Sequence, residues 1–199
     1  MSDPGERVGI TILGSGSGGN AIAIHSARET LLIDAGFSAR EVRRRLEASG
    51  IDEKNVRAVL VTHEHSDHVK GLRVLAEQLA VPIYANRGTA EVLRSRDTKL
   101  GKLVIFAPGS PFSVGEFLVE PFTIPHDAYD PVAFVVKHGP VKLGIATDLG
   151  HVNHLVSHQL QACDALVIES NHDLEMLRNA DRSWSLKQRI IGRHGHLSN

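Results

Sequence analysis

The hydrophobic pattern divides the chain into short strands and amphipathic helices. Apolar or alternating runs of about four to eight residues, bounded by glycine, proline or polar turn residues, are typical of strands. Such runs cover residues 7–13, 21–25, 30–34, 56–62, 81–85, 102–106, 117–124, 132–137, 141–147 and 165–169. Polar caps followed by helical spacing predict helices over residues 38–49, 68–79, 87–95, 152–160, 174–180 and 185–191. The pattern therefore predicts an α/β protein.

The order of these elements predicts the architecture. Strands that could pair as hairpins come first in each half, and strands then alternate with helices. This order fits two sheets with helices on their outer faces better than one parallel sheet. The run over residues 165–169, which is apolar up to Ile168, is interpreted as a further buried strand.

Composition narrows the classes of function. The chain has 199 residues and a formal net charge of −1, so we expect one domain over residues 1–199 and no global attraction to nucleic acid or membrane. Its apolar runs are too short to span a bilayer. The single cysteine, Cys163, excludes an internal disulfide and fits a cytoplasmic protein. Twelve histidines are the unusual feature, because histidine is the commonest metal ligand near neutral pH.

A dense cluster of metal-binding residue types follows the strand predicted to end at residue 62. Its sequence is Thr62-His63-Glu64-His65-Ser66-Asp67-His68. Alternate side chains of extended backbone share a face, so His63 and His65 can hold one ion together. Asp67 and His68 lie at the turn into the next helix and can face a second ion. Imidazole and carboxylate groups are zinc ligands, which favours a metal site over a solvated polar loop.

Further ligands must come from other strand ends, because four side chains cannot complete two metal shells. His126 ends one predicted strand, and Asp148 follows another, where a buried carboxylate needs a cation partner. The alternatives are a surface turn for His126 and a helix N-cap for Asp148. Near the end of the chain, spacing alone does not separate His196 from its rival His194.

The segment after the strand over residues 165–169 carries two more candidates. His172 could be a metal ligand, a general acid or a phosphate contact, and a polar cap on the next helix is an equal alternative. Its neighbour Asn171 is a candidate substrate-binding residue.

A glycine-rich loop covers residues 14–20. Its backbone N–H groups could cradle phosphate, or the loop could serve only as a tight turn at the sheet edge. Ser15, Ser17 and Asn20 are its candidate substrate-binding side chains. Asp34 follows the third predicted strand and is expected to order a ligand-bearing loop.

These residues resemble the signature of the metallo-β-lactamase superfamily. The matching positions are His63-x-His65-x-Asp67-His68, His126, Asp148 and His196. The segments over residues 13–20, 32–36, 125–131, 169–173 and 195–199 are similar to the YycJ/WalJ branch, and together they cover essentially the whole chain. Members of this branch usually continue past the last motif, so we expect the chain to be truncated, or its tail disordered, after residue 199.

The resemblance implies a four-layer αββα sandwich with the metal site at one edge of the two sheets. It implies two divalent ions, zinc or manganese. It assigns His63, His65 and His126 to one ion, Asp67, His68 and His196 to the other, and Asp148 between them. It therefore favours His196 over His194.

The activity that the resemblance implies is hydrolysis of phosphodiester bonds by a metal-activated water. The branch is associated with 5′-to-3′ exonuclease action on DNA, so nucleic acid is the expected substrate, with no membrane partner. Asp67 could orient the water or accept its proton, and His172 could protonate the leaving oxygen. His68 argues against antibiotic hydrolysis, because classical β-lactamases usually lack a histidine after the aspartate.

Two other function classes share this ligand set. One is a small-molecule hydrolase acting on a cyclic phosphodiester or a glyoxalase-like thioester, and the other is a metal-binding regulator without catalysis. The sequence leaves open the metal, the choice of DNA or RNA, and the oligomeric state.

Overall fold

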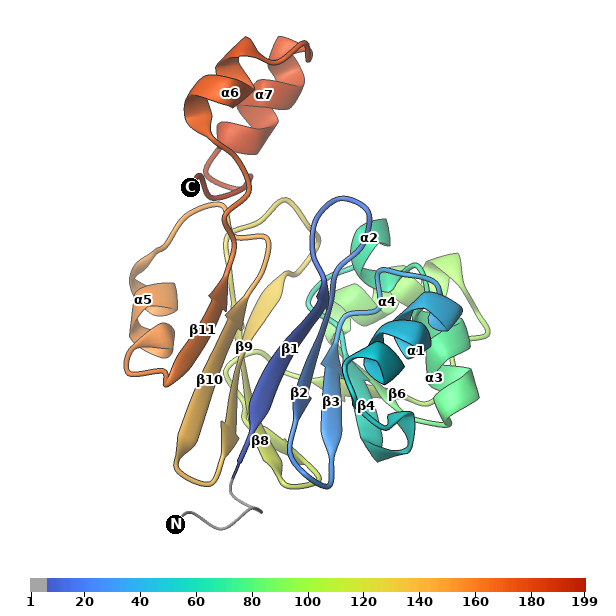
Figure 1. The fold of residues 1–199 in the computed structure, drawn as a ribbon. Coiled ribbons are helices and arrows are strands. Elements are labelled where there is room, and N and C mark those ends of the chain that lie inside the picture. Colours follow the sequence, from blue (N-terminus) through green and yellow to red (C-terminus); the bar gives the residue numbers. More distant parts are fainter. Residues whose placement is uncertain (1–6) are drawn as a thin grey trace.

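The computed structural model describes residues 7–199, in which two β-sheets pack face to face and helices cover both outer faces (Figure 1). This arrangement confirms the predicted αββα sandwich. Within the described residues, no helix combines the length and the apolar character that crossing a lipid bilayer requires.

The first sheet has six strands in the order β1-β2-β3-β4-β5-β6. They are β1 (Gly9–Gly14), β2 (Ala21–His25), β3 (Thr30–Ile33), β4 (Val56–Leu60), β5 (Ile83–Asn86) and β6 (Leu103–Phe106). The first three strands pair antiparallel, and β3 to β6 run parallel. Parallel neighbours need crossover connections. These contain α1 (Ala39–Ala48), the short 3-10 helix η2 (Glu53–Asn55), α2 (Ser66–Val69), α3 (Leu72–Leu79) and α4 (Arg87–Arg96).

The second sheet has five strands in the order β11-β10-β9-β8-β7. They are β7 (Phe112–Val114), β8 (Phe117–Thr123), β9 (Val132–His138), β10 (Val141–Ala146) and β11 (Ala165–Ile168). All pairs are antiparallel except β10 with β11, which are joined through α5 (His154–Leu160). The chain then forms α6 (Leu174–Asn179) and α7 (Trp184–Ile191).

Alternating side chains of the central strands fill three apolar layers. In β2, Ala23 packs with residues of α1 and α3, whereas Ile22 and Ile24 face the second sheet. In β9, Phe134 lies between the sheets and Val135 packs towards α5. Because these strands are buried on both faces, their sequences are continuously apolar over residues 21–24 and 132–136.

The prediction of one helix over residues 68–79 is wrong in one respect. The structure has two helices here, α2 and α3, which are separated at Gly71. A Cβ on Gly71 would lie 1.9 Å from the carbonyl oxygen of Phe37. The Gly71 N–H donates to the carbonyl of Ala35 at 2.8 Å. The chain is therefore bent here by a contact with a segment distant in sequence, which local spacing does not reveal.

The C-terminal part differs from prediction in its burial. The strand predicted as buried over residues 165–169 is the edge strand β11, where Leu166 is 44% and Ile168 40% exposed. Neither α6 nor α7 contains a buried residue, and both project beyond the sandwich (Figure 1). The pattern also missed β7, which has only three residues.

Candidate metal centre

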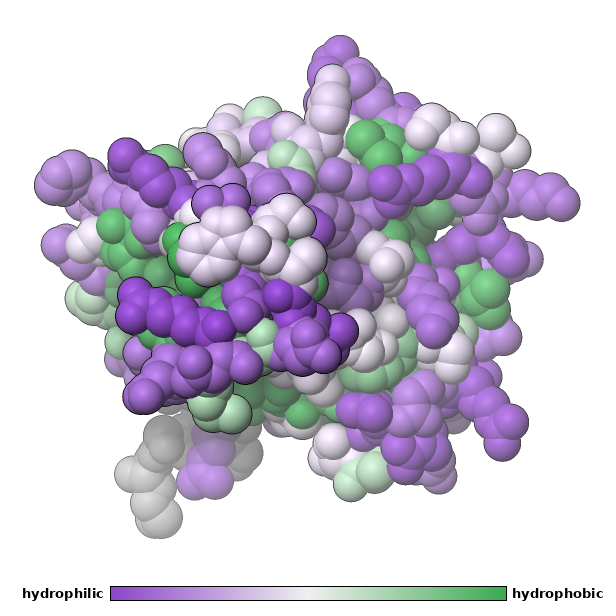
Figure 2. All heavy atoms as spheres, turned by 90° about the horizontal axis from the view of Figure 1, so that it is seen from above, coloured by the Kyte–Doolittle hydropathy of each residue, from purple (hydrophilic) through white to green (hydrophobic). Residues whose placement is uncertain are grey.

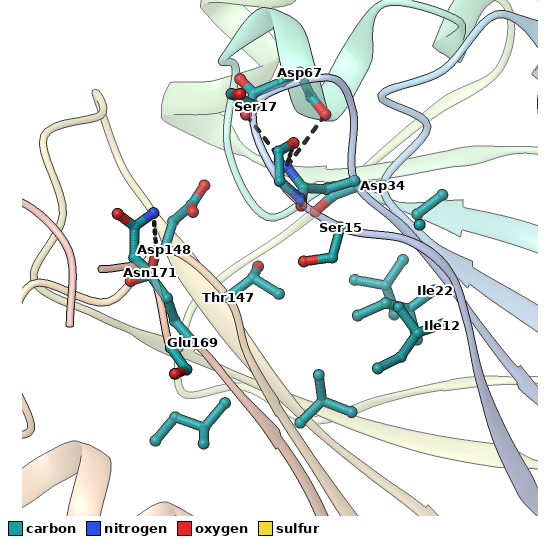
Figure 3. Close-up of a pocket in the computed structure, with 18 of the residues that line it drawn as sticks. Ile12, Ser15, Ser17, Ile22, Asp34, Asp67, Thr147, Asp148, Glu169 and Asn171 are labelled. Carbon is teal, nitrogen blue, oxygen red and sulfur yellow. Dashed lines mark hydrogen bonds between the residues drawn. The ribbon is translucent and has the colours of Figure 1, made fainter. Parts of the chain in front are cut away.

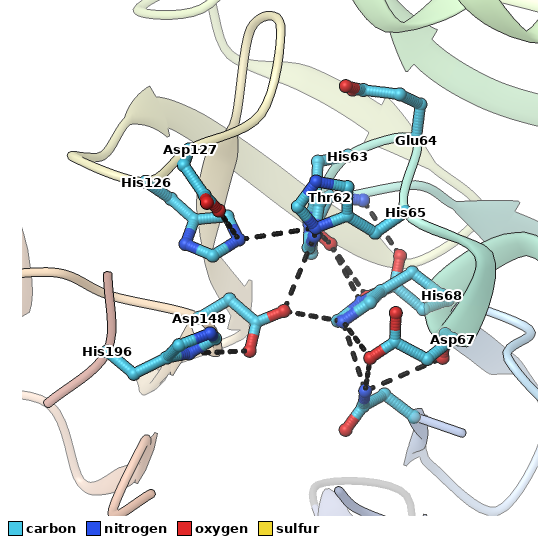
Figure 4. Close-up of polar contacts among 12 residues, drawn as sticks. Thr62, His63, Glu64, His65, Asp67, His68, His126, Asp127, Asp148 and His196 are labelled. Carbon is cyan, nitrogen blue, oxygen red and sulfur yellow. Dashed lines mark hydrogen bonds and ion pairs between the residues drawn. The ribbon is translucent and has the colours of Figure 1, made fainter. Parts of the chain in front are cut away.

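Polar side chains from several strand ends meet at the edge of the sandwich from which α6 and α7 project (Figures 1 and 4). The contributing residues are His63, His65, Asp67 and His68 after β4, His126 after β8, Asp148 after β10, Glu169 after β11 and His196 near the chain end. The two sheets are joined here, because the Val132 N–H donates to the carbonyl of Thr62 at 3.0 Å.

Three histidines form one group of donor atoms. One ring nitrogen from each of His63, His65 and His126 lies within 4.8 Å of the others. Burial lowers the pKa of His63 and of His126, so their rings are neutral near pH 7 and hold lone pairs for a cation. Nδ1 of His126 lies 3.1 Å from the carbonyl of Gly195, which fixes a proton on Nδ1 and leaves Nε2 as the donor atom.

Asp148 touches both sides of the cluster. Its Oδ2 lies 2.6 Å from Nε2 of His68 and 3.3 Å from Nε2 of His63 (Figure 4). Its backbone has a φ of 50°, a left-handed conformation that aspartate tolerates better than most residues. Asp148 does not cap a helix, because the N-cap of α5 is Asn153. One carboxylate is therefore shared between two groups of histidines.

Asp34 orients His68 from behind. Its Oδ2 accepts from the Thr62 hydroxyl at 2.8 Å and from Nδ1 of His68 at 2.8 Å, and its Oδ1 accepts from the Thr62 N–H at 2.8 Å. The Asp34 side chain is 2% exposed. Because Nδ1 of His68 is held in this way, its Nε2 is directed at Asp148.

These carboxylates create a strongly negative local field. Burial opposes protonation of His68, but Asp34 and Asp148 outweigh it and raise the pKa of His68 to about 10. Burial likewise opposes ionisation of Asp148, yet His68 and the other histidines lower its pKa. A site that attracts a proton this strongly also attracts a metal cation, which can replace that proton. The donor set therefore fits divalent cations.

The glycine-rich loop packs against the histidine cluster through Asn20. The Asn20 side-chain amide donates to Oδ2 of Asp67 at 3.2 Å and lies 3.0 Å from Nε2 of His68. Its Oδ1 accepts from the N–H of Gly16 at 3.0 Å. Asn20 is 8% exposed and holds Asp67 and the loop in place through these hydrogen bonds.

His196 lies beside Asp148 and Glu169, whereas the resemblance implied that it joins Asp67 and His68. Its Nδ1 is 2.6 Å from Oε1 of Glu169 and 3.6 Å from Oδ1 of Asp148. Hydrogen bonding to Glu169 raises the pKa of His196. The donor atoms of His196, Asp148 and Glu169 form a third group within 4.8 Å.

Glu169 is the site residue that the sequence reasoning missed. Its Oε2 accepts from the N–H groups of Leu149 and Leu197, at 2.8 and 3.1 Å, and so ties three segments together. The signal was present, because Glu169 follows an apolar strand just as Asp148 does.

The predicted substrate and proton-transfer residues lie in different surroundings. All four predicted substrate-binding residues, Ser15, Ser17, Asn20 and Asn171, line a cavity of about 410 Å³ beside Asp67 and Asp148 (Figure 3). His172 is not among the described residues that line it, and both of its ring nitrogens are buried without a hydrogen-bond partner in the described chain. The helix-cap alternative for His172 is wrong, because Asp173 caps α6 by accepting from the N–H of Met176 at 2.8 Å.

The cavity has walls of two kinds. Ile12 and Ile22 lie together on one side, and Asp148, Glu169 and Asn171 lie on the opposite side (Figure 3). Seen from above this edge, hydrophilic side chains cover most of the face and hydrophobic ones form separate patches (Figure 2). The arrangement suits a polar substrate whose reacting group reaches the carboxylate side.

Comparison with known families now identifies the fold. The model of the Beta-lactamase superfamily domain matches residues 29–199. The chain belongs to this superfamily. Exodeoxyribonuclease YycJ of Bacillus anthracis is 36% identical over 95% of this chain and 72% of that relative. Exodeoxyribonuclease WalJ of Streptococcus pneumoniae is 35% identical over the same shares of the two chains. These relatives confirm the YycJ/WalJ branch.

Solved structures of the superfamily share the fold at low sequence identity. The zinc-bound PqqB of Methylobacterium extorquens has a TM-score of 0.71 and 21% identity, over 95% of this chain and 80% of that one. YhfI of Bacillus subtilis has a TM-score of 0.72 and 20% identity, over 95% and 76%. At this identity the likeness establishes the β-lactamase fold alone.

Proposed function

We propose that this member of the β-lactamase superfamily is a metal-dependent nuclease, a 5′-to-3′ exonuclease acting on DNA. The observation that carries the proposal is the shared carboxylate of Asp148, which contacts both His63 and His68 and so suits a centre of two ions. Two relatives that match 95% of the chain are named exodeoxyribonucleases, which supports DNA as the substrate. A cytoplasmic location fits this substrate and is part of the proposal.

The proposed ligand assignment follows the geometry on each side of Asp148. His63, His65 and His126 would hold one ion, and Asp67 and His68 would hold the other, with Asp148 shared. His196, whose Nδ1 is held by Glu169, would complete the coordination of the second ion. Zinc and manganese both suit this mixture of imidazole and carboxylate donors.

Divalent ions bound there would lower the pKa of water and neutralise charge on a phosphate group. The chain itself contributes orientation and proton transfer. Asp67, whose side chain is 30% exposed, faces the cavity and can accept a proton from the attacking water. Ser15 and Ser17 can donate hydrogen bonds to phosphate oxygens along the cavity wall. The role of His172 as proton donor stays a prediction, because it requires its ring to reach the cavity.

One panel of substrates tests the proposal. Metal-replete protein is incubated with bis-p-nitrophenyl phosphate, with single- and double-stranded DNA and RNA labelled at the 5′ or 3′ end, and with a glutathione thioester. A 5′-to-3′ exonuclease releases the 5′ label as a mononucleotide from the first time points. A strand labelled at its 3′ end instead becomes progressively shorter while it keeps the label. Cleavage of the thioester alone would overturn the nuclease assignment in favour of a small-molecule hydrolase.

Two controls make the panel specific. Asp67→Ala and His65→Ala should each remove cleavage of DNA and of the small phosphodiester together. Binding to polynucleotide should weaken as salt rises, because phosphate contacts release counterions.

A further inference from the structure

Glu64 lies between His63 and His65 in sequence but points away from the metal centre (Figure 4). Extended backbone places successive side chains on opposite faces, so the two histidines and Glu64 project in opposite directions. Glu64 is nevertheless 6% exposed. A buried carboxylate outside the ligand set needs an explanation, since burying a charge is unfavourable without specific partners.

The partner of Glu64 is the loop that carries His126. Oε1 of Glu64 accepts a hydrogen bond from the backbone N–H of Tyr129 at 2.9 Å, three residues after His126. Oε2 is buried and has no hydrogen-bond partner in the described part of the chain. The backbone carbonyl of Glu64 accepts from the Arg96 guanidinium at 2.6 Å. Glu64 is thus attached to α4 by its backbone and to the His126 loop by its side chain.

The next residue of that loop is fixed to the same part of the protein. The carbonyl of Asp130 accepts from the side-chain amide of Asn86 at 2.6 Å and lies 3.5 Å from the hydroxyl of Thr89. Both side chains are fully buried at the start of α4. The loop over residues 125–131 therefore has one anchor on α4 and one on the segment of His63 and His65.

The geometry points to Glu64 as a positioning residue that couples the two segments holding the three-histidine group. We infer that its hydrogen bond to Tyr129 sets how far His126 stands from His63 and His65, and so sets the affinity of that group for a divalent ion. The inference rests on the metal centre of the proposed function. It adds a residue that binds no ion and touches no substrate, yet determines how tightly the ion of the three-histidine group is held.

Metal binding by purified protein tests the inference without reference to nuclease activity. Zn²⁺ affinity is measured by competition with a chromophoric chelator, and Co²⁺ is titrated while its visible absorption reports the geometry of the bound ion. Glu64→Ala should weaken binding of the ion held by the three-histidine group by about tenfold to a hundredfold, as loss of ligand-orienting contacts does. It should also alter the Co²⁺ spectrum.

Two variants separate positioning from charge and from stability. Glu64→Gln keeps an oxygen that can accept from Tyr129, so it should bind Zn²⁺ within about threefold of the unchanged chain and retain its Co²⁺ spectrum. Glu47→Ala removes an exposed glutamate on α1 and should change neither readout.

If Glu64→Ala does not fold, as judged by circular dichroism, the same hydrogen bond is removed from the other side. Tyr129→Pro deletes the N–H donor and Tyr129→Ala retains it, so only the proline variant should weaken binding. The inference is overturned if folded Glu64→Ala binds Zn²⁺ normally, if Glu64→Gln is as weak as Glu64→Ala, or if the two Tyr129 variants behave alike. Absence of metal binding by the unchanged chain would instead contradict the proposed metal centre.

Discussion

The two sides of the centre are built differently. On the N-terminal side, Asp34, Thr62, His63 and His68 are at most 2% exposed and are joined by short hydrogen bonds. On the C-terminal side, α6 and α7 contain no buried residue, and His196 is held mainly by Glu169. The first side is therefore fixed by the core of the sandwich, whereas the second depends on a few polar contacts.

The largest expected effect comes from the residue that joins the two sides. Asp148→Asn keeps the size of the side chain but removes the charge that His63 and His68 share. Loss of several kcal/mol of charge stabilisation predicts a fall in DNA cleavage of about a thousandfold. End-labelled DNA measures the rate, and elemental analysis should show fewer ions per chain. Retention of both the full rate and the full metal content would contradict a shared carboxylate.

Stability should also distinguish the two regions. Leu60 on β4 is fully buried between the sheets, so Leu60→Ala should lower the free energy of unfolding by about 2–5 kcal/mol. Met176 on α6 is 75% exposed, and Met176→Ala should change the free energy of unfolding by less than about 0.5 kcal/mol. Denaturant titration followed by circular dichroism measures both. Equal losses would mean that α6 belongs to the same cooperative core.

Two carboxylates that hold a histidine of the centre, one on each side, can be compared by matched substitutions. Asp34→Asn leaves Nδ1 of His68 without its anionic acceptor, and Glu169→Gln does the same to Nδ1 of His196. Losing such a partner weakens metal binding by about tenfold to a hundredfold. We expect the larger loss for Asp34, because it is more deeply buried and also binds Thr62. Chelator competition gives both affinities, and a larger loss for Glu169→Gln would reverse the comparison.

Affinity for metal should depend on pH through His68. Its pKa is raised to about 10, so in the metal-free protein His68 carries a proton near pH 7 that an ion must displace. Affinity should therefore rise by roughly tenfold per pH unit between about pH 7 and 9 for one displaced proton. Titration calorimetry in buffers of different ionisation enthalpy counts the protons released. Release of no proton would contradict the raised pKa.

The same shift predicts how the stability of the metal-free protein changes with pH. A raised folded-state pKa contributes stability that is fully present below the ordinary value of 6.5 and is lost as pH rises through about 10. The lowered pKa of His63 has the opposite effect on stability. As pH falls below 6.5, His63 gains a proton in the unfolded chain but not in the folded one, so the folded state becomes less stable. The contribution of His68 should become smaller in Asp34→Asn, because Asp148 alone then stabilises the proton on His68.

The sequence predicted the N-terminal side well because its signals are local. The strand β4 is apolar except for the exposed Arg57, and the histidines follow it within eight residues of its last residue, Leu60. The N-cap of α1, Ser38, and the strand β2 were also placed correctly. In each case neighbouring residues carry enough information to define the element.

The remaining features depend on contacts between distant segments. The bend at Gly71 is set by Phe37, and the exposure of β11 is set by its place at the edge of the sheet. The pairing of Glu169 with His196 joins residues 27 positions apart. Local periodicity contains no information on any of these contacts, and two of the three lie on the C-terminal side of the centre.

The most direct test of a two-metal nuclease centre measures DNA cleavage against the number of ions bound per chain. Metal-free protein is loaded stepwise with Zn²⁺ or Mn²⁺, the bound ions are counted after dialysis, and release of mononucleotides from 5′-labelled DNA is followed in each sample. Cleavage should appear as the second ion binds and should be abolished by chelation. Full cleavage by metal-free protein, or intact DNA with two ions bound, would contradict the two-metal centre.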